Sequence, residues 1–183
     1  MKYRSIGSIS RRALLATLSA SVLTHPSWAI AEKKTGEFKL NYMLASCMYG
    51  KLDVKECISQ ASRIGATSID LWPPSHGDQR NQIDLIGHDH YIKACVDASV
   101  KPQMTTRYDL GPFGLKDEIK IVKRLGGKMI VCGSTGNKDG SLKEQVAAFI
   151  EKMRPHVAIA EEAGLVIAIE NHSNALIHSP DSL

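Results

Sequence analysis

The sequence predicts an α/β fold in which parallel strands alternate with helices. Five short apolar runs lie between residues 40 and 170, and four stretches with apolar residues at helical spacing separate them. Strand–helix–strand repeats of this kind form parallel sheets with right-handed crossovers. The last run, residues 166–169, stops at Glu170, Asn171 and His172. It predicts a strand buried on both faces that carries polar side chains at its carboxyl end.

The first strand is predicted over residues 40–48, and the helix after it begins at Asp53. Glu56, three residues further on, completes a capping-box pattern. Gly65 ends this helix, and the second strand covers residues 68–72. The apolar face of the helix consists of Val54, Cys57, Ile58, Ala61 and Ile64.

The next helix is predicted at residues 89–98, with Ile92, Cys95 and Val96 buried. The third strand at 103–107, a helix at 115–125 and the fourth strand at 129–132 follow. Ser141 and Glu144 form a capping box on a long helix that Pro155 is expected to kink or split, and Gly164 ends it before the fifth strand. Residues 179–181, Ser-Pro-Asp, predict the start of one more helix.

Two architectures fit this order of elements. One is an open doubly wound sheet of five strands, and the other is a partial (β/α)₈ barrel of about five βα units, truncated after strand five, since a whole barrel needs about 250 residues. The helix start predicted at residues 179–181 favours the partial barrel, because a further helix would follow the fifth strand. No G-x-G-x-x-G follows the first strand and no Walker loop occurs, so a nucleotide-binding sheet lacks its usual marks.

The N-terminus is typical of an export signal. Residues 10–15, Ser-Arg-Arg-Ala-Leu-Leu, resemble a twin-arginine pattern; an apolar stretch to about residue 23 and the small residues of Ala29-Ile30-Ala31 follow. The stretch is shorter than the about 20 apolar residues that span a bilayer. We therefore expect residues 1–31 to be a twin-arginine-type signal peptide and residues 38–183 to be an exported, periplasmic or otherwise extracytoplasmic domain with no stable membrane span. An uncleaved anchor or an unremarkable leader is the alternative.

Charge and cysteine content exclude other classes. The net charge of +4 equals the four basic residues within 1–31, so the remainder is balanced and indicates no nucleic-acid partner. The four cysteines have no C-x-x-C spacing and fall on strands or apolar helix faces, which predicts buried free thiols rather than a zinc site or a disulfide framework. They are Cys47, Cys57, Cys95 and Cys132.

From residue 39 to 183 the sequence resembles the xylose isomerase-like TIM-barrel family, which contains sugar phosphate isomerases and epimerases. The motifs, in order, are Leu40-Asn41-Tyr42, Ile64-Gly65-Ala66 leading into Ile69-Asp70-Leu71-Trp72, Arg124-Leu125-Gly126-Gly127, and Ala163-Gly164 before Ile167-Ala168-Ile169-Glu170-Asn171-His172. The resemblance implies that Glu170 binds a divalent metal ion (Mn, Mg, Co or Zn) and transfers a proton. The family's other ligands, which follow strands six to eight, would lie beyond Leu183.

Residues near the strand ends are candidates for binding a small sugar or polyol. Trp72 can present an apolar wall to a sugar ring or be part of the core; His76 follows it in a loop. Arg107 can contact an anionic group or form a salt bridge with a neighbouring acid. His172 can orient a ligand or touch a sugar hydroxyl, or be a solvated loop residue. His88 and His90, two apart, do not share a helix face and are not interpreted as a metal pair.

The leading hypothesis is a sugar (phosphate) isomerase or epimerase that uses a divalent metal and carboxylate proton transfer, present as a fragment that is inactive alone. The alternative is a non-catalytic remnant or a half barrel that self-associates through its open edges. A multi-zinc endonuclease is disfavoured, because strand three ends in Arg107, Tyr108 and Asp109 without a histidine. The loop at residues 133–137 can also be interpreted as an anion cradle or as an ordinary glycine-rich turn.

Overall fold

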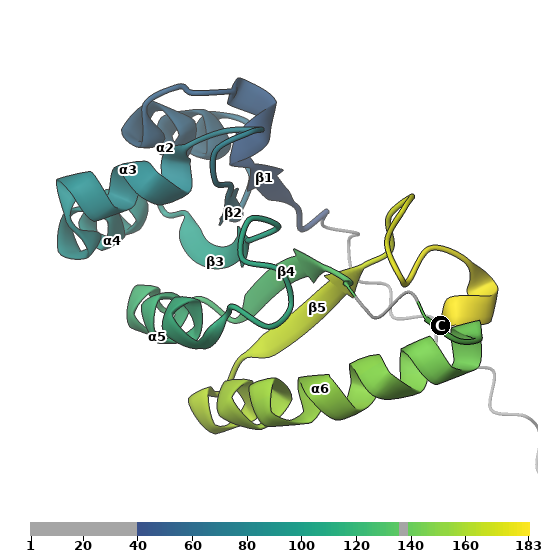
Figure 1. The fold of residues 1–183 in the computed structure, drawn as a ribbon. Helices are drawn as coiled ribbons and strands as arrows, with labels where there is room; N and C mark the ends of the chain where they lie inside the picture. The colour runs from purple at the N-terminus through teal and green to yellow at the C-terminus, as the bar shows by residue number, and fades with distance from the viewer. Residues whose placement is uncertain (1–39, 136–138) are drawn as a thin grey trace, which may run out of the picture. The chain divides into compact units, whose positions relative to one another are not determined.

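A computed structural model of the protein describes residues 40–135 and 139–183 (Figure 1). The chain divides into two compact units, residues 1–39 and 40–183, and the description below concerns the second. The predicted signal peptide lies outside the described residues. Within them, no helix has both the length and the hydropathy needed to cross a membrane.

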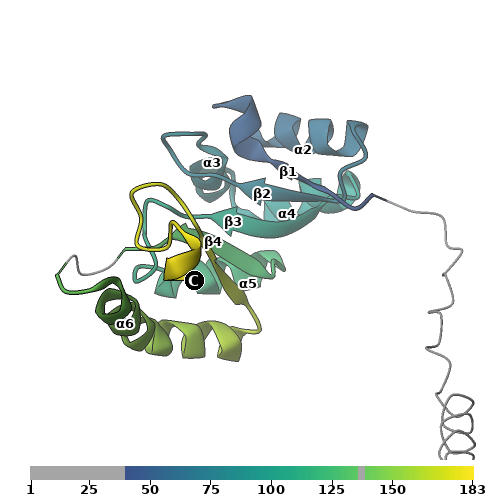
Figure 2. The ribbon, with the colours of Figure 1, turned by 90° about the vertical axis from the view of Figure 1, so that its right-hand side faces the viewer.

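Five parallel strands form one sheet in which each strand is hydrogen-bonded to its neighbours in sequence order (Figure 2). The parallel pairing confirms the predicted α/β class. The strict order 1-2-3-4-5 is that of a barrel wall, because an open doubly wound sheet reverses direction at a switch point. The strands are β1 (Met43–Ala45), β2 (Ser68–Leu71), β3 (Lys101–Thr106), β4 (Met129–Gly133) and β5 (Val166–Glu170).

Helices follow the strands as the pattern predicts, with one addition, α3, between β2 and the expected helix. They are α2 (Val54–Arg63), α3 (Gln79–Ile86), α4 (His88–Asp97), α5 (Lys116–Leu125) and α6 (Leu142–Ala163). Two 3₁₀ helices, η1 (Ser46–Tyr49) and η2 (Pro180–Ser182), complete the described elements. The structure is therefore a partial barrel of five βα units, with α2 beside β1 and α6 beside β5 (Figures 1 and 2).

The core lies between the sheet and its helices, where the buried apolar residues form three clusters. Alternate strand residues such as Ile69 and Leu71 of β2 and Ile130 and Cys132 of β4 point into it. Because strand side chains alternate between faces, the residues between them belong to the inner face. Cys57, Cys95 and Cys132 are buried free thiols, which confirms the prediction for three of the four cysteines.

Several local predictions were wrong. Ile64, predicted on the apolar face of α2, is exposed, and Asp53 caps this helix by accepting from the Lys55 N–H without the reciprocal bond from Glu56.

The first strand ends at Ala45 rather than at residue 48, because the buried Ser46 begins η1 and its hydroxyl accepts a hydrogen bond from the Trp72 backbone N–H at 3.0 Å. Val96 is exposed rather than buried. The inward face of α4 is set by Tyr91 and Cys95, four residues apart, which turns the position after Cys95 outward.

The predicted capping box of α6 is confirmed: the Ser141 hydroxyl accepts from the Glu144 backbone N–H, and the Glu144 carboxylate accepts from the Ser141 backbone N–H. Pro155 does not split this helix, which continues over 22 residues. Proline leaves the carbonyl four residues earlier, on Glu151, without its helical donor. Glu151 is exposed, so water can bond that carbonyl.

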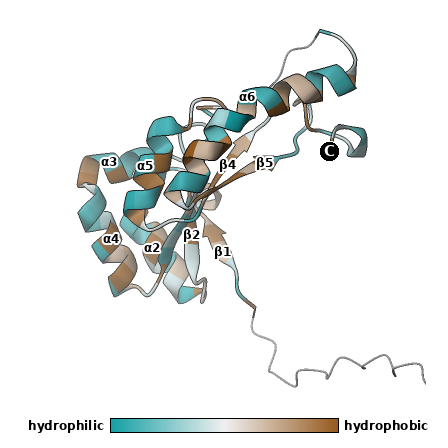
Figure 3. Ribbon diagram, turned by 90° about the horizontal axis from the view of Figure 1, so that it is seen from below, coloured by the Kyte–Doolittle hydropathy of each residue, from teal (hydrophilic) through white to brown (hydrophobic). Residues whose placement is uncertain are grey.

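The prediction that the fifth strand is buried on both faces was also wrong. Ile167 and Ile169 pack outward against α6, whereas Val166, on the inner face, is 54% exposed. Val166 and Glu170 are exposed and Ala168 between them is partly buried, so the inner face of β5 is only partly covered. Figure 3 shows the apolar residues of β4 and β5 beside the mixed surface of α6.

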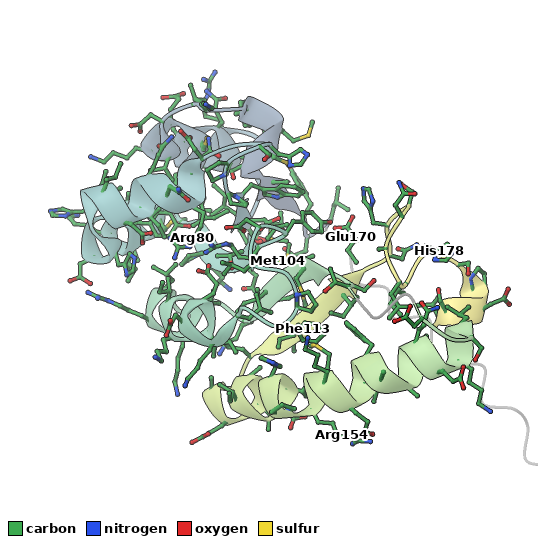
Figure 4. The ribbon with its side chains drawn as sticks, viewed as in Figure 1. Arg80, Met104, Phe113, Arg154, Glu170 and His178 are labelled. Atoms are coloured by element: carbon green, nitrogen blue, oxygen red, sulfur yellow. The ribbon has the colours of Figure 1, made fainter. Side chains whose placement is uncertain are left out.

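A buried network of charges joins α3, α5 and the end of β3. The guanidinium of Arg80 donates two parallel hydrogen bonds to Glu118, at 2.8 and 2.9 Å, and a third to Asp84 at 2.8 Å. Arg107 also donates to Glu118 and pairs with Asp109. Arg80 and Glu118 are each 2% exposed, so this bidentate pair lies within the protein interior. Figure 4 labels Arg80.

Replacing Glu118 with leucine should destabilise the domain by about 3–5 kcal/mol, because it leaves two arginines without their shared buried carboxylate. Urea unfolding of parent and variant measures the free energy. Asp97→Ala, which breaks the exposed Lys93–Asp97 pair on α4, is the control and should cost about 0–1 kcal/mol. Equal losses in the two variants would contradict a structural role for the buried network.

Candidate functional site

A cavity of about 610 Å³ lies at the carboxyl ends of the strands. Every strand contributes to its wall, through the residues that immediately follow it or end it. The wall consists of Cys47 after β1, Trp72 and His76 after β2, Tyr108 after β3, Gly133, Ser134 and Thr135 at the end of β4, and Glu170 and residues 172–175 at the end of β5. This is the edge at which α/β barrels place their active sites.

Aromatic rings form one side of the cavity. The indole of Trp72 meets the ring of His76 edge-on, with centroids 5.5 Å apart, and meets the ring of Tyr108 edge-on at 5.7 Å. Gly133 leaves space for the tyrosine, since a Cβ at this position would lie 3.4 Å from its ring. The result is an apolar wall next to polar groups, an arrangement common in small-molecule sites.

Asp70 lies behind this wall on the inner face of β2. Its Oδ2 accepts one hydrogen bond from the Trp72 indole N–H at 2.7 Å and one from the Thr106 hydroxyl at 2.8 Å. Its Oδ1 is buried and has no hydrogen-bond partner among the described residues. Burial raises the pKa of Asp70 to about 6 against the lowering effect of these two bonds, and the nearby charge of Glu170 raises it further.

Sequence reasoning missed Asp70 and Tyr108 as parts of this site. A signal was present for the acid, because a carboxylate between Ile69 and Leu71 interrupts an otherwise apolar strand and must face the opposite side. Tyr108 lies two residues beyond Thr106 and so continues the inner face of β3. Its approach to Trp72 depends on the pairing of β2 with β3, which the sequence pattern does not specify.

Glu170 ends β5, where it pairs in register with Gly133, and its exposed carboxylate lies on the cavity wall (Figure 4). The loop after it is anchored by the Ile177 N–H, which donates to the Ser134 hydroxyl at 2.7 Å. In that loop, Nδ1 of His172 lies 2.8 Å from the Ser173 carbonyl oxygen. A carbonyl can only accept, so Nδ1 carries the proton and Nε2 of the neutral ring has a lone pair.

Cys47 lines the cavity but has no character of a nucleophile. Burial raises the pKa of its thiol, and the charge of Asp70 adds to this effect. Because the thiolate is the reactive form, the raised pKa keeps this cysteine inert near neutral pH. Covalent thiol catalysis is therefore disfavoured, which leaves Glu170 and the histidines as the groups able to move protons at this edge.

The structure brings together four of the five residues predicted for the site: Glu170, Trp72, His76 and His172 line the same cavity. Arg107 is not among the lining residues, since its guanidinium pairs with Asp109 and Glu118. Its contact with a substrate anion stays a prediction.

The loop at residues 133–137 lies only partly within the described residues, so the anion cradle also stays untested. Gly133, Ser134 and Thr135 are the part of it that reaches the cavity wall.

The described residues do not form a complete metal site. Across 40–135 and 139–183, no group of three or more His, Cys, Asp or Glu side chains is arranged to hold an ion. Glu170 and His172 are two donors at one edge, whereas structural and catalytic zinc sites use at least three protein ligands and magnesium prefers several oxygens. The role of Glu170 as a metal ligand therefore stays a prediction.

Comparison with solved structures identifies the architecture. The domain superposes on the IolI protein with a bound zinc atom at a TM-score of 0.64 and 14% identity, over 78% of this chain and 56% of that one. It matches a xylose isomerase-like TIM barrel protein from Mycobacterium smegmatis in complex with magnesium at 0.57 and 11% identity, over 79% and 59%. The domain has the fold of the xylose isomerase-like TIM barrels.

A third match is the 3-keto-D-glucoside 4-epimerase YcjR from E. coli, at a TM-score of 0.56 and 12% identity, over 73% of this chain and 56% of the epimerase. No protein-family model matches the sequence, and no curated protein does either. The chain spans a little over half the length of the solved structures that it matches. The predicted resemblance is thus confirmed for the fold, with the five units of a partial barrel.

Asp70 should make stability fall as the pH rises from about 4 to about 6. Its pKa is higher in the folded than in the unfolded state, so its contribution is fully present below the unfolded value of 3.8 and is lost as the pH passes about 6. A shift of this size corresponds to about 3 kcal/mol. Asp70→Asn stays neutral at every pH. The free energy of unfolding of this variant minus that of the parent should therefore increase between about pH 4 and about pH 6 and stay constant at higher pH.

Chemical denaturation of both proteins at several pH values between 3 and 8 measures this difference. Asp109→Asn is the control with the opposite sign, because the Arg107 guanidinium holds the pKa of Asp109 below its usual value despite partial burial. The parent's advantage over that variant should shrink as the pH falls. If the difference in unfolding free energy between Asp70→Asn and the parent does not change with pH, Asp70 does not have a pKa raised by burial.

Proposed function

We propose that this domain binds a small sugar or polyol at the carboxyl ends of its strands and serves an isomerase or epimerase reaction in which Glu170 transfers the proton. The observation that carries the proposal is one cavity built from all five strand ends, lined both by a carboxylate and by an aromatic wall. The sugar epimerase among the matched structures supports this class of substrate.

Different residues of the cavity suit different parts of a sugar. Sugar rings carry C–H bonds on their faces and hydroxyls on their edges, so Trp72 suits the face and polar groups suit the edge. The carboxylate of Glu170 takes a proton from the carbon next to a carbonyl. Delivery of a proton to the opposite face of the same carbon, by an acid other than Glu170, inverts its configuration. Return of the proton by Glu170 to the neighbouring carbon, with transfer of the hydroxyl proton to the former carbonyl oxygen, moves the carbonyl.

The developing negative charge on the substrate carbonyl oxygen requires hydrogen-bond donors. The Thr135 and Ser173 hydroxyls and the His76 imidazole lie on the same cavity wall as Glu170 and can supply them. Nε2 of His172, which has a lone pair, can accept from a substrate hydroxyl. Zinc and magnesium in two of the matched structures support a divalent ion in this class, with Glu170 as one ligand.

We also propose that the chain is exported through its twin-arginine pattern, on the basis of residues 10–31. That segment lies outside the described residues. A fusion of residues 1–39 to a reporter that is active only after export tests it, with Arg11 and Arg12 both replaced by lysine as the control.

Glu170→Gln should abolish proton exchange, because the amide keeps the size of the side chain but cannot accept the proton. The measurement is deuterium incorporation from D₂O into aldoses and ketoses at the carbon next to the carbonyl, followed by NMR. A loss of at least about 100-fold is expected for a general base. His178→Ala, in the same C-terminal segment but outside the cavity wall, is the control. Equal exchange by parent and Glu170→Gln would contradict proton transfer by Glu170. No exchange by either would contradict catalysis by this domain alone and would agree with the expected inactive fragment.

Self-association is the second candidate function, and an apolar groove between α6 and β5 favours it. Ile150 and Val157 of α6, 49% and 38% exposed, line this groove together with Ile167 and Ile169 of β5. Large exposed apolar side chains gathered in one groove mark an interaction surface. The occupant proposed here is a second copy of the chain, because β5 has a hydrogen-bonded neighbour on one side only among the described strands.

Light scattering during gel filtration tests this alternative on the full chain. The parent should elute as a dimer or larger species, and Val157→Lys should shift it toward the monomer by placing a charge in the groove. Leu85→Lys is the matched control, since Leu85 is 86% exposed on α3 and does not line the groove. A monomeric parent would rule out the self-associating half barrel.

A further inference from the structure

Asp70 is buried directly behind the aromatic wall and touches it at one point. The residue is 3% exposed, and its carboxylate is not among the groups that line the cavity. Its Oδ2 accepts from the indole N–H of Trp72 and from the hydroxyl of Thr106. Of the residues that line the cavity, the acid is hydrogen-bonded to Trp72 through the indole that it holds.

The indole of Trp72 is fixed from two directions. Its backbone N–H donates to the Ser46 hydroxyl at 3.0 Å, which ties the residue to the end of β1. Its ring N–H donates to Asp70 at 2.7 Å, which sets the rotation of the ring about its own side chain. The contacts with His76 and Tyr108 are edge-on, and such contacts alone hold a ring about half as strongly as a hydrogen bond to a charged group.

We propose that Asp70 is a positioning residue that holds the indole of Trp72 as a flat wall of the cavity and thereby selects ligands that present a ring face. This inference rests on the proposed function, because it names the class of sugar: one held in a ring with its carbonyl on a ring carbon, as in a ketopyranoside, so that the C–H bond next to the carbonyl is kept, rather than an open chain. A closed sugar ring gathers C–H bonds on one face and can lie against the indole, whereas an open-chain polyol has no such face.

Thr106 extends the same arrangement to the next strand. Its hydroxyl donates to the Asp70 carboxylate at 2.8 Å, and Tyr108, two residues further along, provides the second ring of the wall. The carboxylate thus links the β2 side of the wall to the β3 side. Neighbouring Thr105 faces the other side of the strand, and its hydroxyl is buried with no hydrogen-bond partner among the described residues.

These neighbours supply a matched pair of variants. Thr106→Val removes a bond to Asp70 and keeps the shape of the side chain. Thr105→Val makes the same chemical change one residue away and touches no bond of the wall. Asp70→Ala removes both bonds to the carboxylate, and Asp70→Asn keeps one oxygen that can accept from the indole.

The first measurement reports whether the indole of Trp72 stays ordered in the absence of any ligand. Trp28 and Trp72 are the two tryptophans of the chain, so all variants are made with Trp28→Phe, which leaves Trp72 as the spectroscopic reporter. Asp70→Ala should weaken the near-ultraviolet circular dichroism of Trp72 and raise its quenching by acrylamide. Thr106→Val should give a smaller change, and Thr105→Val none. If Asp70→Ala does not fold, Asp70→Asn and Thr106→Val still give the comparison.

The second measurement reads ligand selection with two probes, methyl α-D-glucopyranoside, which is locked in a ring, and sorbitol, an open chain. Trp72 fluorescence in the Trp28→Phe protein should report tighter binding of the glucoside. Asp70→Ala should weaken glucoside binding about tenfold, as expected for losing a hydrogen bond to a charged group, and leave sorbitol unchanged. Asp70→Asn should restore part of the difference.

The two measurements separate the inference from the function on which it rests. If the Trp28→Phe protein binds neither probe, the sugar-binding proposal and the ring selection both fail, while the spectroscopic comparison still decides whether Asp70 positions the indole. If the glucoside binds and Asp70→Ala binds it equally well with an unchanged Trp72 spectrum, the positioning role is overturned. If Asp70→Ala changes the Trp72 spectrum and also loses the preference for the glucoside over sorbitol, the positioning role of Asp70 is supported.

Discussion

The parallel pairing of five strands in sequence order is the constraint on which the remainder of the structure depends. It places every strand's carboxyl end at the same edge, so residues far apart in the chain, from Cys47 to Glu170, meet around one cavity. It also directs alternate side chains outward to the helices and inward to the cavity side. The apolar core and the polar site are thus two faces of one sheet.

Buried charges give the two faces different roles. On the helix side, Glu118 is held by two arginines and joins α3 to α5, which stabilises the frame. On the inner side, Asp70 has two donors on one oxygen and none on the other, and burial raises its pKa. A carboxyl that costs stability near neutral pH while it bonds a cavity residue is typical of a functional site rather than of a structural one.

Local patterns predicted most of the elements because their causes are local. The capping box at Ser141 and Glu144, the left-handed Gly164 that ends α6, and the short apolar runs of β2 and β4 depend on a few neighbouring residues. Burial was predicted less well where it depends on neighbours in space. Val166 belongs to an apolar run, yet its exposure follows from the only partly covered inner face of β5, and Val96 is exposed because Tyr91 fixes the rotation of α4.

The sequence by itself determined that strands and helices alternate, that the strands are parallel, and that Glu170 and His172 end a strand, since periodicity and turn residues encode these features along the chain. Only the tertiary structure decided which strand ends share a cavity. It brought Trp72 against Tyr108 and placed Asp70 behind them, and it engaged Arg107 in ion pairs away from the cavity wall. The physical reason is that strand pairing and register fix distances between residues some 36 positions apart, as for Asp70 and Thr106, and no local propensity specifies those distances.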